Sequence, residues 1–348
     1  MNNTKSKVLF EGGKIFRKAD EWLKLMKITE VNKKWMLETL ENKAFNCMNP
    51  SFVDKTKLNN EIVFNGRSFD GWKSLQREDI KNYKNVEIYP DNVLQIIDKL
   101  LKQKVIEEVQ EDKRSKITIN PLSYTVSKNG KPRILLHTKL NSIMRINSQY
   151  LDGINAVVNQ IYDYNYQTKL DCASCFHQFG ITSESSKLMG FQFNNRVFKY
   201  LVLPFGYSGS IIVVQTFLNL LAANMRINGV FCSLFVDDYY MATKEVHQLE
   251  KARENFSKLT DKVGLIMEPR KDSGIVCSLQ YLGIWIDLKQ KVINCNDKMT
   301  EIKTIIKTIL DKNFINFDKI EQLCDYLEFV SSVCIEGGKM QVHFLRSD

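Results

Sequence analysis

Two adjacent carboxylates, Asp237 and Asp238, follow an apolar segment that begins at Phe231. A third carboxylate, Asp171, ends a second apolar segment that begins at Tyr166. Adjacent acids repel each other, so a site that keeps both ionised needs a cation close by. Two divalent ions can stabilise both the attacking and the leaving oxygen of a phosphoryl transfer. Three acids carried by strand-like segments therefore indicate a two-metal nucleotidyl transferase.

The charge balance is compatible with that chemistry. The chain has 348 residues, with 49 basic and 40 acidic side chains and a net charge of +9. A basic excess favours a nucleic-acid partner, although a lysine-rich proteome would give the same balance. A chain of this length can form two or three subdomains with a sizeable core.

No segment indicates export or membrane insertion. The N-terminus lacks the apolar core of a signal peptide, and no stretch approaches the ~18 apolar residues of a membrane span. Eight irregularly spaced cysteines are typical of reduced thiols. Cys172 and Cys175 form a single CxxC, and we expect small buried side chains there rather than a zinc or redox site. The expected location is intracellular, in the cytoplasm or nucleus, with no membrane partner.

Regular elements become recognisable from Pro90 onward. Asp91 can cap a helix whose apolar positions, from Val93 to Leu101, follow helical spacing. Asn129-Gly130 separates two apolar runs and predicts a β-hairpin, because both turn positions tolerate positive φ. Its tip carries three cations that could clamp a triphosphate or simply be solvated, namely Lys128, Lys131 and Arg133.

The remaining elements are expected from periodicity and turn residues. They are a turn-rich loop at 203–210, a buried helix from Ile211, an amphipathic helix at 246–263, a strand at 280–287 and two tail helices at 298–310 and 317–332. Residues 1–75 are rich in lysine and allow short amphipathic helices without recognisable chemistry.

The order of these motifs resembles the reverse transcriptases of retroelements, in particular gypsy-like LTR and DIRS-like tyrosine-recombinase elements. Six motifs stand in the family's order between about Val93 and about Leu345. The resemblance implies an α+β right-hand polymerase with fingers, palm and thumb, whose antiparallel palm sheet is backed by helices. It implies a helical N-terminal extension at 1–88, fingers and palm at 89–290, and a thumb/connection-like helical region at 291–348.

The resemblance also implies catalytic roles. Leu170-Asp171 looks like the first catalytic motif, and the segment from Phe235 to Asp238 looks like the second, with Phe235 where tyrosine is commoner. Lys271 stands at the position of a lysine that protonates the leaving pyrophosphate, although an exposed loop lysine is the alternative reading. The implied catalytic residues are Asp171, Asp237, Asp238 and Lys271, and the implied metal ligands are Asp171, Asp237 and Asp238.

Other motifs would hold the nucleotide and the primer. Arg133 matches an arginine whose forked guanidinium suits phosphate. Phe176 would block a ribose 2′-hydroxyl, unless it is a core aromatic, and the loop that ends at Gly206 would pack beside the templating pair. The implied nucleotide-binding residues are Arg133, Ser174, Cys175, Phe176, Phe205 and Gly206, and the implied primer grip is Tyr281, Leu282 and Gly283.

Three positions depart from the family pattern. Ile211 stands where proline is usual, Val214 where phenylalanine is usual, and His137 where aspartate is usual. These departures place the fine geometry of the loop before Ile211, and the strength of any activity, in question.

The function implied by the resemblance is RNA-directed DNA synthesis by two-metal nucleotidyl transfer. The cofactors would be two Mg²⁺ ions, with Mn²⁺ as a substitute, because hard oxygen ligands favour Mg²⁺. The partners would be an RNA or DNA template with its primer, deoxynucleoside triphosphates, and other element-encoded proteins or subunits. Basic side chains would follow the duplex backbone without reading sequence.

Two alternatives remain open. An RNA-dependent RNA polymerase would usually carry aspartate at the position of Phe176 and glycine at that of Val236, which disfavours it. A catalytically weak or inactive domesticated protein, acting as a nucleic-acid-binding or scaffold subunit, fits the three departures. The intact Asp171, Asp237 and Asp238 argue for the enzyme, since a retired site has no need of three mutually repelling acids.

Overall fold

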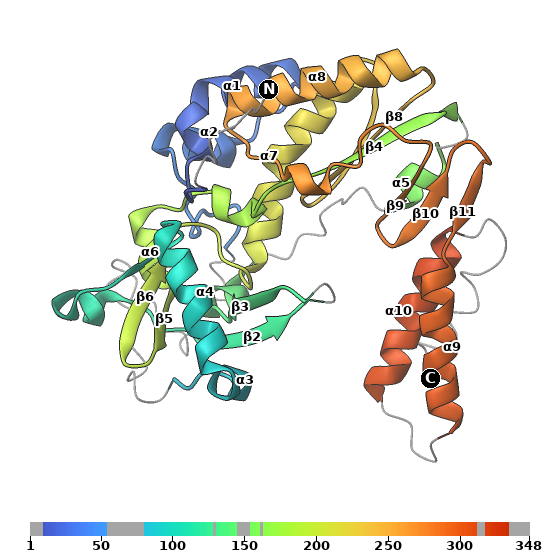
Figure 1. Cartoon of the computed structure of the whole chain (residues 1–348). Helices are drawn as coiled ribbons and strands as arrows, with labels where there is room; N and C mark the ends of the chain where they lie inside the picture. Colours follow the sequence, from blue (N-terminus) through green and yellow to red (C-terminus); the bar gives the residue numbers. More distant parts are fainter. Residues whose placement is uncertain are drawn as a thin grey trace, which may run out of the picture. The chain divides into compact units, whose positions relative to one another are not determined.

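The computed structural model describes residues 10–53, 80–127, 130–144, 154–160, 163–311 and 317–333. They form a mixed α+β fold of two compact units, and most of the helices and strands are labelled in Figure 1. The first unit draws its described residues from Met1–Gln149, Cys172–Leu221 and Lys258–Ile266, and the second from Tyr150–Asp171, Ala222–Ser257 and Met267–Asp348.

The first unit combines helices, a hairpin and an antiparallel sheet. Its helices are α1 (Ala19–Ile28), α2 (Lys34–Asn42), α3 (Lys84–Ile88), α4 (Pro90–Lys102) and α6 (Ser183–Leu188), with 3-10 turns η1 (Ile15–Lys18), η5 (Glu111–Lys116), η6 (Lys139–Ile143) and η8 (Cys175–Gln178). The sheet order is β1 (Ile106–Glu108), β6 (Arg196–Tyr200), β5 (Gly190–Phe193), and the hairpin joins β2 (Leu122–Val126) to β3 (Pro132–Leu136). Helices α7 (Ser208–Ile227) and α8 (Val246–Val263) contribute residues to both units.

The second unit contains two small antiparallel sheets and helices. One sheet has the order β4 (Tyr166–Asp171), β8 (Asp238–Thr243), β7 (Phe231–Phe235), and the other β11 (Val292–Asn294), β10 (Ile284–Asp287), β9 (Ser278–Tyr281). Its remaining elements are α5 (Ile154–Val158), η9 (Pro269–Lys271), α9 (Asn296–Leu310) and α10 (Phe317–Val333). Helices α9 and α10 pack on each other, and α10 also contacts α5.

Most of the expected elements are confirmed, with two corrections. The hairpin, the helix at 246–263 and both tail helices are present, although Lys128 and Asn129 of the hairpin turn lie outside the described residues. Helix α4 begins with Pro90, so Asp91 lies in its first turn and does not cap it. There its charge still complements the helix dipole. The single strand expected at 280–287 is wrong, because the chain reverses between β9 and β10.

An aromatic core joins the N-terminal helices to α7 within the first unit. The ring of Phe217, in α7, meets Phe16, Trp22 and Trp35 edge-on at centroid distances of 5.0, 5.4 and 5.8 Å. Edge-to-face packing of this kind adds to the free energy of burying the rings. The N-terminal helices are therefore part of the core of this unit. The boundary expected at residue 88 stays a prediction.

His177, in η8, is buried in the same unit. Its Nε2 atom has no hydrogen-bond partner among the described residues, and its ring meets Phe205 edge-on at 5.3 Å. Burial, and to a lesser extent the positive charges of Lys99 and Arg133, lower the pKa of His177 to about 4. The imidazole is therefore neutral at neutral pH.

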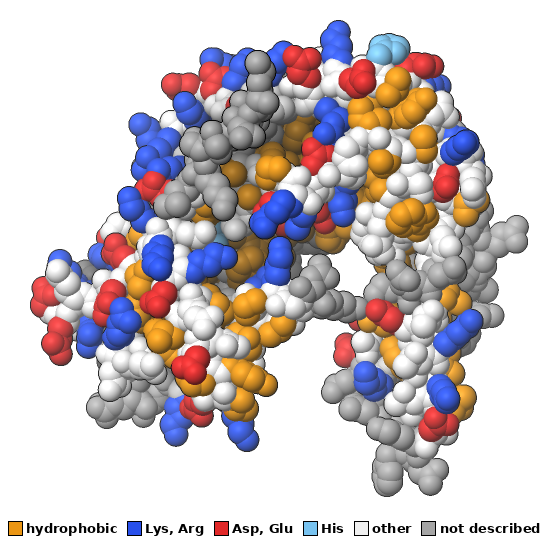
Figure 2. All heavy atoms as spheres, in the orientation of Figure 1, with side chains coloured by type: hydrophobic (Ala, Val, Ile, Leu, Met, Phe, Trp, Pro, Cys, Tyr) orange, Lys and Arg blue, Asp and Glu red, His pale blue; other side chains and the backbone are white. Residues whose placement is uncertain are grey.

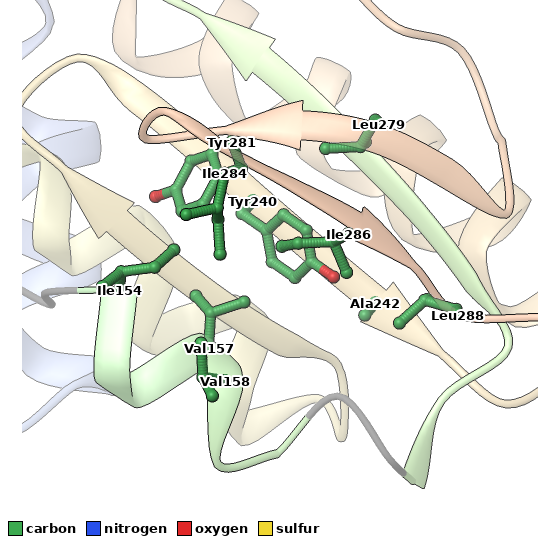
Figure 3. Close-up of a cluster of buried hydrophobic side chains, with 10 residues drawn as sticks. All are labelled: Ile154, Val157, Val158, Tyr240, Ala242, Leu279, Tyr281, Ile284, Ile286 and Leu288. Carbon is green, nitrogen blue, oxygen red and sulfur yellow. The ribbon is translucent and has the colours of Figure 1, made fainter. Parts of the chain in front are cut away.

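The core of the second unit lies between its two sheets and α5. Figure 3 shows side chains from β8, β9 and β10 meeting those of α5. The cluster consists of Ile154, Val157, Val158, Tyr240, Ala242, Leu279, Tyr281, Ile284, Ile286 and Leu288. Alternating buried and exposed positions in β10 leave Trp285 half exposed and bury Ile284 and Ile286.

Helix α7 is long and apolar enough to cross a membrane, contrary to the expectation that no stretch approaches the length of a span. Of its most apolar stretch, 56% is buried inside the protein. Core helices of soluble proteins meet the same criterion of length and composition. The expected buried helix from Ile211 is confirmed, with its start at Ser208.

Replacing Trp22 by alanine should lower the free energy of unfolding by about 3–5 kcal/mol, because a fully buried indole leaves a large cavity. Urea denaturation of the full chain measures this. The matched control is Trp285→Ala, where a half-exposed indole should cost less than about 1.5 kcal/mol. Equal losses in the two variants would contradict an integral N-terminal core.

His177 should make stability depend on pH. Its folded pKa of about 4 lies below the ordinary histidine pKa of 6.5, so its contribution to stability is complete above about pH 6.5 and is lost as pH falls toward 4. Between pH 7.5 and 4.5 this loss is about 2 kcal/mol. His177→Gln should remove this part of the fall in the free energy of unfolding, measured by urea denaturation. His247→Gln, at an exposed histidine, should not. If the free energy of unfolding of His177→Gln falls with pH as steeply as that of the wild type, the buried imidazole is not held neutral.

Candidate active site

The register of β4 and β8 brings two of the three predicted acids together. In this antiparallel pair, Asp171 lies directly opposite Asp238. Directly opposed residues have Cα atoms about 4.5–5.5 Å apart, so their side chains can touch. Strands β7 and β8 form a hairpin in which Phe235 pairs with Asp238, leaving Val236 and Asp237 as its two-residue turn. All three carboxylates therefore lie at one end of this sheet.

The turn that carries Asp237 is strained. Val236 has a φ of +56°, a conformation that a β-branched residue rarely adopts. Such backbone strain costs on the order of 1–3 kcal/mol and persists only where the surrounding structure enforces it. The paired strands on both sides enforce it here, and the tight turn keeps Asp237 next to Asp238.

The acids perturb one another as the sequence predicted. Asp171 is buried, and its side chain is hydrogen-bonded to that of Asp238. Burial, this hydrogen bond and the charges of Asp237 and Asp171 raise the pKa of Asp238 to about 7, against the opposing effect of Lys169. Near neutral pH Asp238 is therefore only partly ionised, and a bound cation would favour its ionised form.

Lys271 supplies a positive charge to this cluster from η9. Its ammonium donates a hydrogen bond to Oδ2 of Asp171. Burial lowers the pKa of Lys271, but the hydrogen bond to Asp171 and the charges of the three carboxylates raise it above its usual value. The lysine is therefore protonated at neutral pH and can act as a proton donor.

The segment around Lys271 is fixed by contacts that the sequence did not reveal. Arg253, in α8, binds the carboxylate of Asp272 through two hydrogen bonds of 2.8 and 2.7 Å and also donates to the hydroxyl of Thr168. Ser273 pairs with Lys169, since its backbone N donates to the Lys169 carbonyl at 3.1 Å and its hydroxyl accepts from the Lys169 N at 2.8 Å. These contacts hold Lys271 beside β4.

The carboxylate oxygens of the three aspartates fit a hard divalent cation whose remaining ligands come from water and substrate phosphates. Among the described residues, no group of three or more His, Cys, Asp and Glu side chains is arranged to hold a metal ion by itself. Mg²⁺ is usually held by one or two carboxylates, with waters and substrate phosphates completing the octahedron. The touching pair Asp171 and Asp238, with Asp237 beside it, matches that open type of site.

The predicted primer-grip residues also lie in the second unit, at the turn between β9 and β10. Tyr281 pairs with Ile284, so Leu282 and Gly283 form a two-residue turn, with φ of +47° and +84°. Positive φ at both turn positions matches the right-handed twist of a hairpin. The buried Tyr281 hydroxyl donates to the backbone carbonyl of Asp238 at 3.3 Å. This hairpin is therefore in direct contact with the start of β8, next to the acidic turn.

The first unit brings three predicted nucleotide-binding residues together. The Arg133 guanidinium lies over the Phe205 ring, 5.1 Å from its centroid. Phe176 meets the same ring edge-on at 5.1 Å. A cation over an aromatic face is attracted by the ring quadrupole, so Phe205 orients Arg133. Ser174, with a φ of +47°, and the buried Cys175 open the 3-10 turn that carries Phe176.

Gly206 is required by its surroundings. Its φ is +97°, and a Cβ added there would lie 2.3 Å from the Leu136 carbonyl oxygen. Asn141 fastens the same loop, donating to the Gly206 carbonyl at 2.7 Å and accepting from the Ser208 N at 2.9 Å. Only glycine combines this φ with so close a backbone contact.

The structure accommodates two of the three departures through local packing and leaves the third unexplained. The His137 ring lies against Tyr83 with 4.4 Å between centroids, and its Nε2 is 2.7 Å from the Ser123 hydroxyl, so it has its own local partners. Val214 is fully buried in α7. Ile211 is exposed near the start of that helix, and nothing in the structure explains its identity.

The predicted residues therefore form two groups. The three aspartates, Lys271 and the turn at Tyr281 lie in the second unit, whereas Arg133, Phe176, Phe205 and Gly206 lie in the first. The chain connects the groups directly, since Cys172 follows Asp171. The seven described cysteines form no disulfide, and Cys172 and Cys175 are buried, as expected.

Relatives of known sequence are distant polyproteins. A polyprotein of Cassava vein mosaic virus is 24% identical over 300 residues, which cover 78% of this chain and 46% of that protein. The Pol polyprotein from transposon 412 of Drosophila melanogaster is 23% identical over 206 residues, or 58% of this chain and 16% of that protein. The chain thus spans less than half the length of these relatives.

Two solved structures share the fold over most of this chain. The foamy viral protease-reverse transcriptase in complex with double-stranded DNA has a TM-score of 0.62 at 18% identity, covering 94% of this chain and 55% of that one. The same viral protein with an RNA/DNA hybrid has a TM-score of 0.58 at 16% identity, covering 89% of this chain and 40% of that one. Identities this low show the fold alone, and they agree with the expected polymerase fold.

The family is shown by the sequence. Residues 89–286, more than half of the chain, match the family described as reverse transcriptase (RNA-dependent DNA polymerase). The matching transposon polyproteins agree with the expected gypsy-like resemblance, and the DIRS-like resemblance stays a prediction. The chain belongs to the reverse transcriptase family.

Proposed function

We propose that this chain is an active RNA-directed DNA polymerase that uses two-metal nucleotidyl transfer. The observation that carries the proposal is the β4–β8 register, which pairs Asp171 with Asp238 beside a strained turn that carries Asp237. A protein that only binds nucleic acid gains nothing from the cost of crowding three carboxylates. Residues 1–88, 89–290 and 291–348 would serve as N-terminal extension, fingers with palm, and thumb.

The three aspartates would hold the catalytic ions. Bound Mg²⁺, or Mn²⁺ in its place, would supply Lewis-acid activation of the primer 3′-hydroxyl and neutralise charge on the leaving pyrophosphate. Asp171 and Asp237 would be the principal ligands, and Asp238, whose pKa is raised to about 7, would be ionised when a cation is bound. Lys271, protonated and fixed beside Asp171, would donate a proton to the leaving group.

The residues of the first unit would bind the incoming deoxynucleotide. Arg133 is held over Phe205 with its forked guanidinium, which can bind phosphate oxygens in pairs. Phe176, braced edge-on against Phe205, would meet the sugar and exclude a 2′-hydroxyl. The backbone at Ser174 and Cys175 would face the triphosphate, and Gly206 allows the loop its close approach to β3.

The partners proposed are a template with its primer, deoxynucleoside triphosphates and other element-encoded chains, at an intracellular location. The foamy viral structures carry double-stranded DNA or an RNA/DNA hybrid. The net charge of +9 favours such partners. On the face shown in Figure 2, Lys and Arg side chains lie among Asp and Glu side chains. Binding should follow the phosphate backbone and weaken as salt rises.

Replacing Asp237 by asparagine should lower primer extension on poly(rA)/oligo(dT) by roughly 1,000-fold, because the loss of a metal ligand removes several kcal/mol of transition-state stabilisation. The assay uses the full chain with Mg²⁺ or Mn²⁺. Asp163→Asn, at an exposed aspartate of the same unit, is the matched control and should extend normally. Duplex binding without extension by the wild type would favour the inactive, binding-only alternative.

Replacing Phe176 by alanine should admit ribonucleotides, raising their incorporation relative to deoxynucleotides by about 10-fold or more, since the ring would no longer meet the 2′-hydroxyl. Single-nucleotide extension with matched dNTP and rNTP pairs measures the ratio. Phe176→Tyr keeps the ring and should retain the discrimination of the wild type. Unchanged sugar discrimination in Phe176→Ala would remove Phe176 from the nucleotide site and leave it a core aromatic.

A further inference from the structure

Gln167 lies in β4, four residues before Asp171, and its side chain is fully buried. Its Nε2 donates to two backbone carbonyls, those of Cys277 at 2.8 Å and Ile286 at 3.0 Å. Its Oε1 accepts from the Tyr240 hydroxyl at 2.8 Å. Both amide hydrogens and the amide oxygen are therefore used, in a place where an unpaired polar group would be costly.

These bonds join three elements that carry the proposed chemistry. Gln167 itself belongs to the strand that ends in Asp171, and Tyr240 belongs to β8, two residues after Asp238. Cys277 precedes β9 and Ile286 lies in β10, so both belong to the hairpin that carries the turn at Leu282. The backbone of Gln167 adds two bonds to Val276, of 2.9 and 3.0 Å.

A second set of contacts joins the hairpin to β8, at the end of the hairpin near its turn. The Tyr281 hydroxyl donates to the carbonyl of Asp238, and the Tyr281 and Tyr240 rings lie with centroids 5.0 Å apart. Figure 3 shows both tyrosines in the same buried cluster, with Ile284 and Ile286 beside them. The hairpin is thus fixed to the acid-bearing strands at two places.

We propose that Gln167 is a positioning residue that sets the place of the β9–β10 turn relative to Asp171 and Asp238, and hence the place of the primer 3′ end. The proposal rests on the proposed polymerase function. Gln167 touches none of the acids and acts through Tyr240 and the hairpin. An apolar side chain of the same size would fill the space, but it has no directional bonds to fix the two sheets against each other. A shift of about 1 Å in a reacting group can cost on the order of 100-fold in rate.

The test compares Gln167→Met with a matched buried amide elsewhere. Asn120, in the first unit, is equally buried and donates to the carbonyls of Leu188 and Gly190, both at 2.9 Å, so Asn120→Leu loses similar bonds away from the acids. Both variants of the full chain are measured for primer–template affinity, dNTP affinity and the rate of a single addition. Tyr240→Phe, which removes one hydroxyl, is the milder variant in case Gln167→Met fails to fold.

The expected result is a 10- to 100-fold fall in the addition rate of Gln167→Met, with dNTP affinity unchanged within about twofold. Tyr240→Phe should show a smaller fall in the same direction, and Asn120→Leu should keep the wild-type rate at temperatures where it is folded. Equal effects of Gln167→Met and Asn120→Leu would show that Gln167 only stabilises the fold and would overturn the proposal.

Hydrogen exchange gives a readout that needs no catalysis. Gln167→Met, or Tyr240→Phe if needed, should lose protection together in β8 and in the β9–β10 hairpin, with the first unit unchanged. Loss confined to β4, or no loss, would overturn the proposal. If the wild type extends no primer, the polymerase function fails, and the exchange pattern still decides whether Gln167 couples these elements.

Discussion

The antiparallel pairing of β4 with β8 is the constraint on which the candidate site depends. Because side chains alternate along a strand, a slip of one residue would turn Asp171 away from Asp238. The pairing also forces the two-residue turn at Val236 and so places Asp237 next to the other acids. Carboxylate repulsion opposes this arrangement, and the hydrogen bond between Asp171 and Asp238 and the ammonium of Lys271 offset it.

Buried polar groups fix the positions of the elements that pack around the β4–β8 pair. Hydrophobic burial supplies the free energy that holds the two sheets and α5 together, but it has no direction. Direction comes from the amide of Gln167, which holds the β9–β10 hairpin in place, and from the bidentate pair of Arg253 with Asp272, which holds the Lys271 segment. Fully satisfied networks of this kind specify one arrangement of a core.

In the first unit, close packing orients the side chains that are proposed to bind the nucleotide. Phe205 lies between Arg133 and Phe176, so one loop residue orients both the cation and the ring proposed to meet the nucleotide. The absence of a side chain at Gly206 lets that loop approach β3 closely, and the amide of Asn141, in η6, fastens it. The departure at His137 is accommodated by its own contacts with Tyr83 and Ser123.

The sequence by itself determined the features that short-range physics controls. Helical periodicity predicted α4, α8 and the tail helices, and the adjacent Asp237 and Asp238 indicated where a candidate site could lie, because these signals lie within a few residues of each other. The tertiary structure alone decided which distant groups meet. Lys271 reaches Asp171 across 100 residues, Arg253 reaches Thr168 across 85, and Tyr240 reaches Gln167 across 73. No local pattern marks such partners, since the packing of the whole chain selects them.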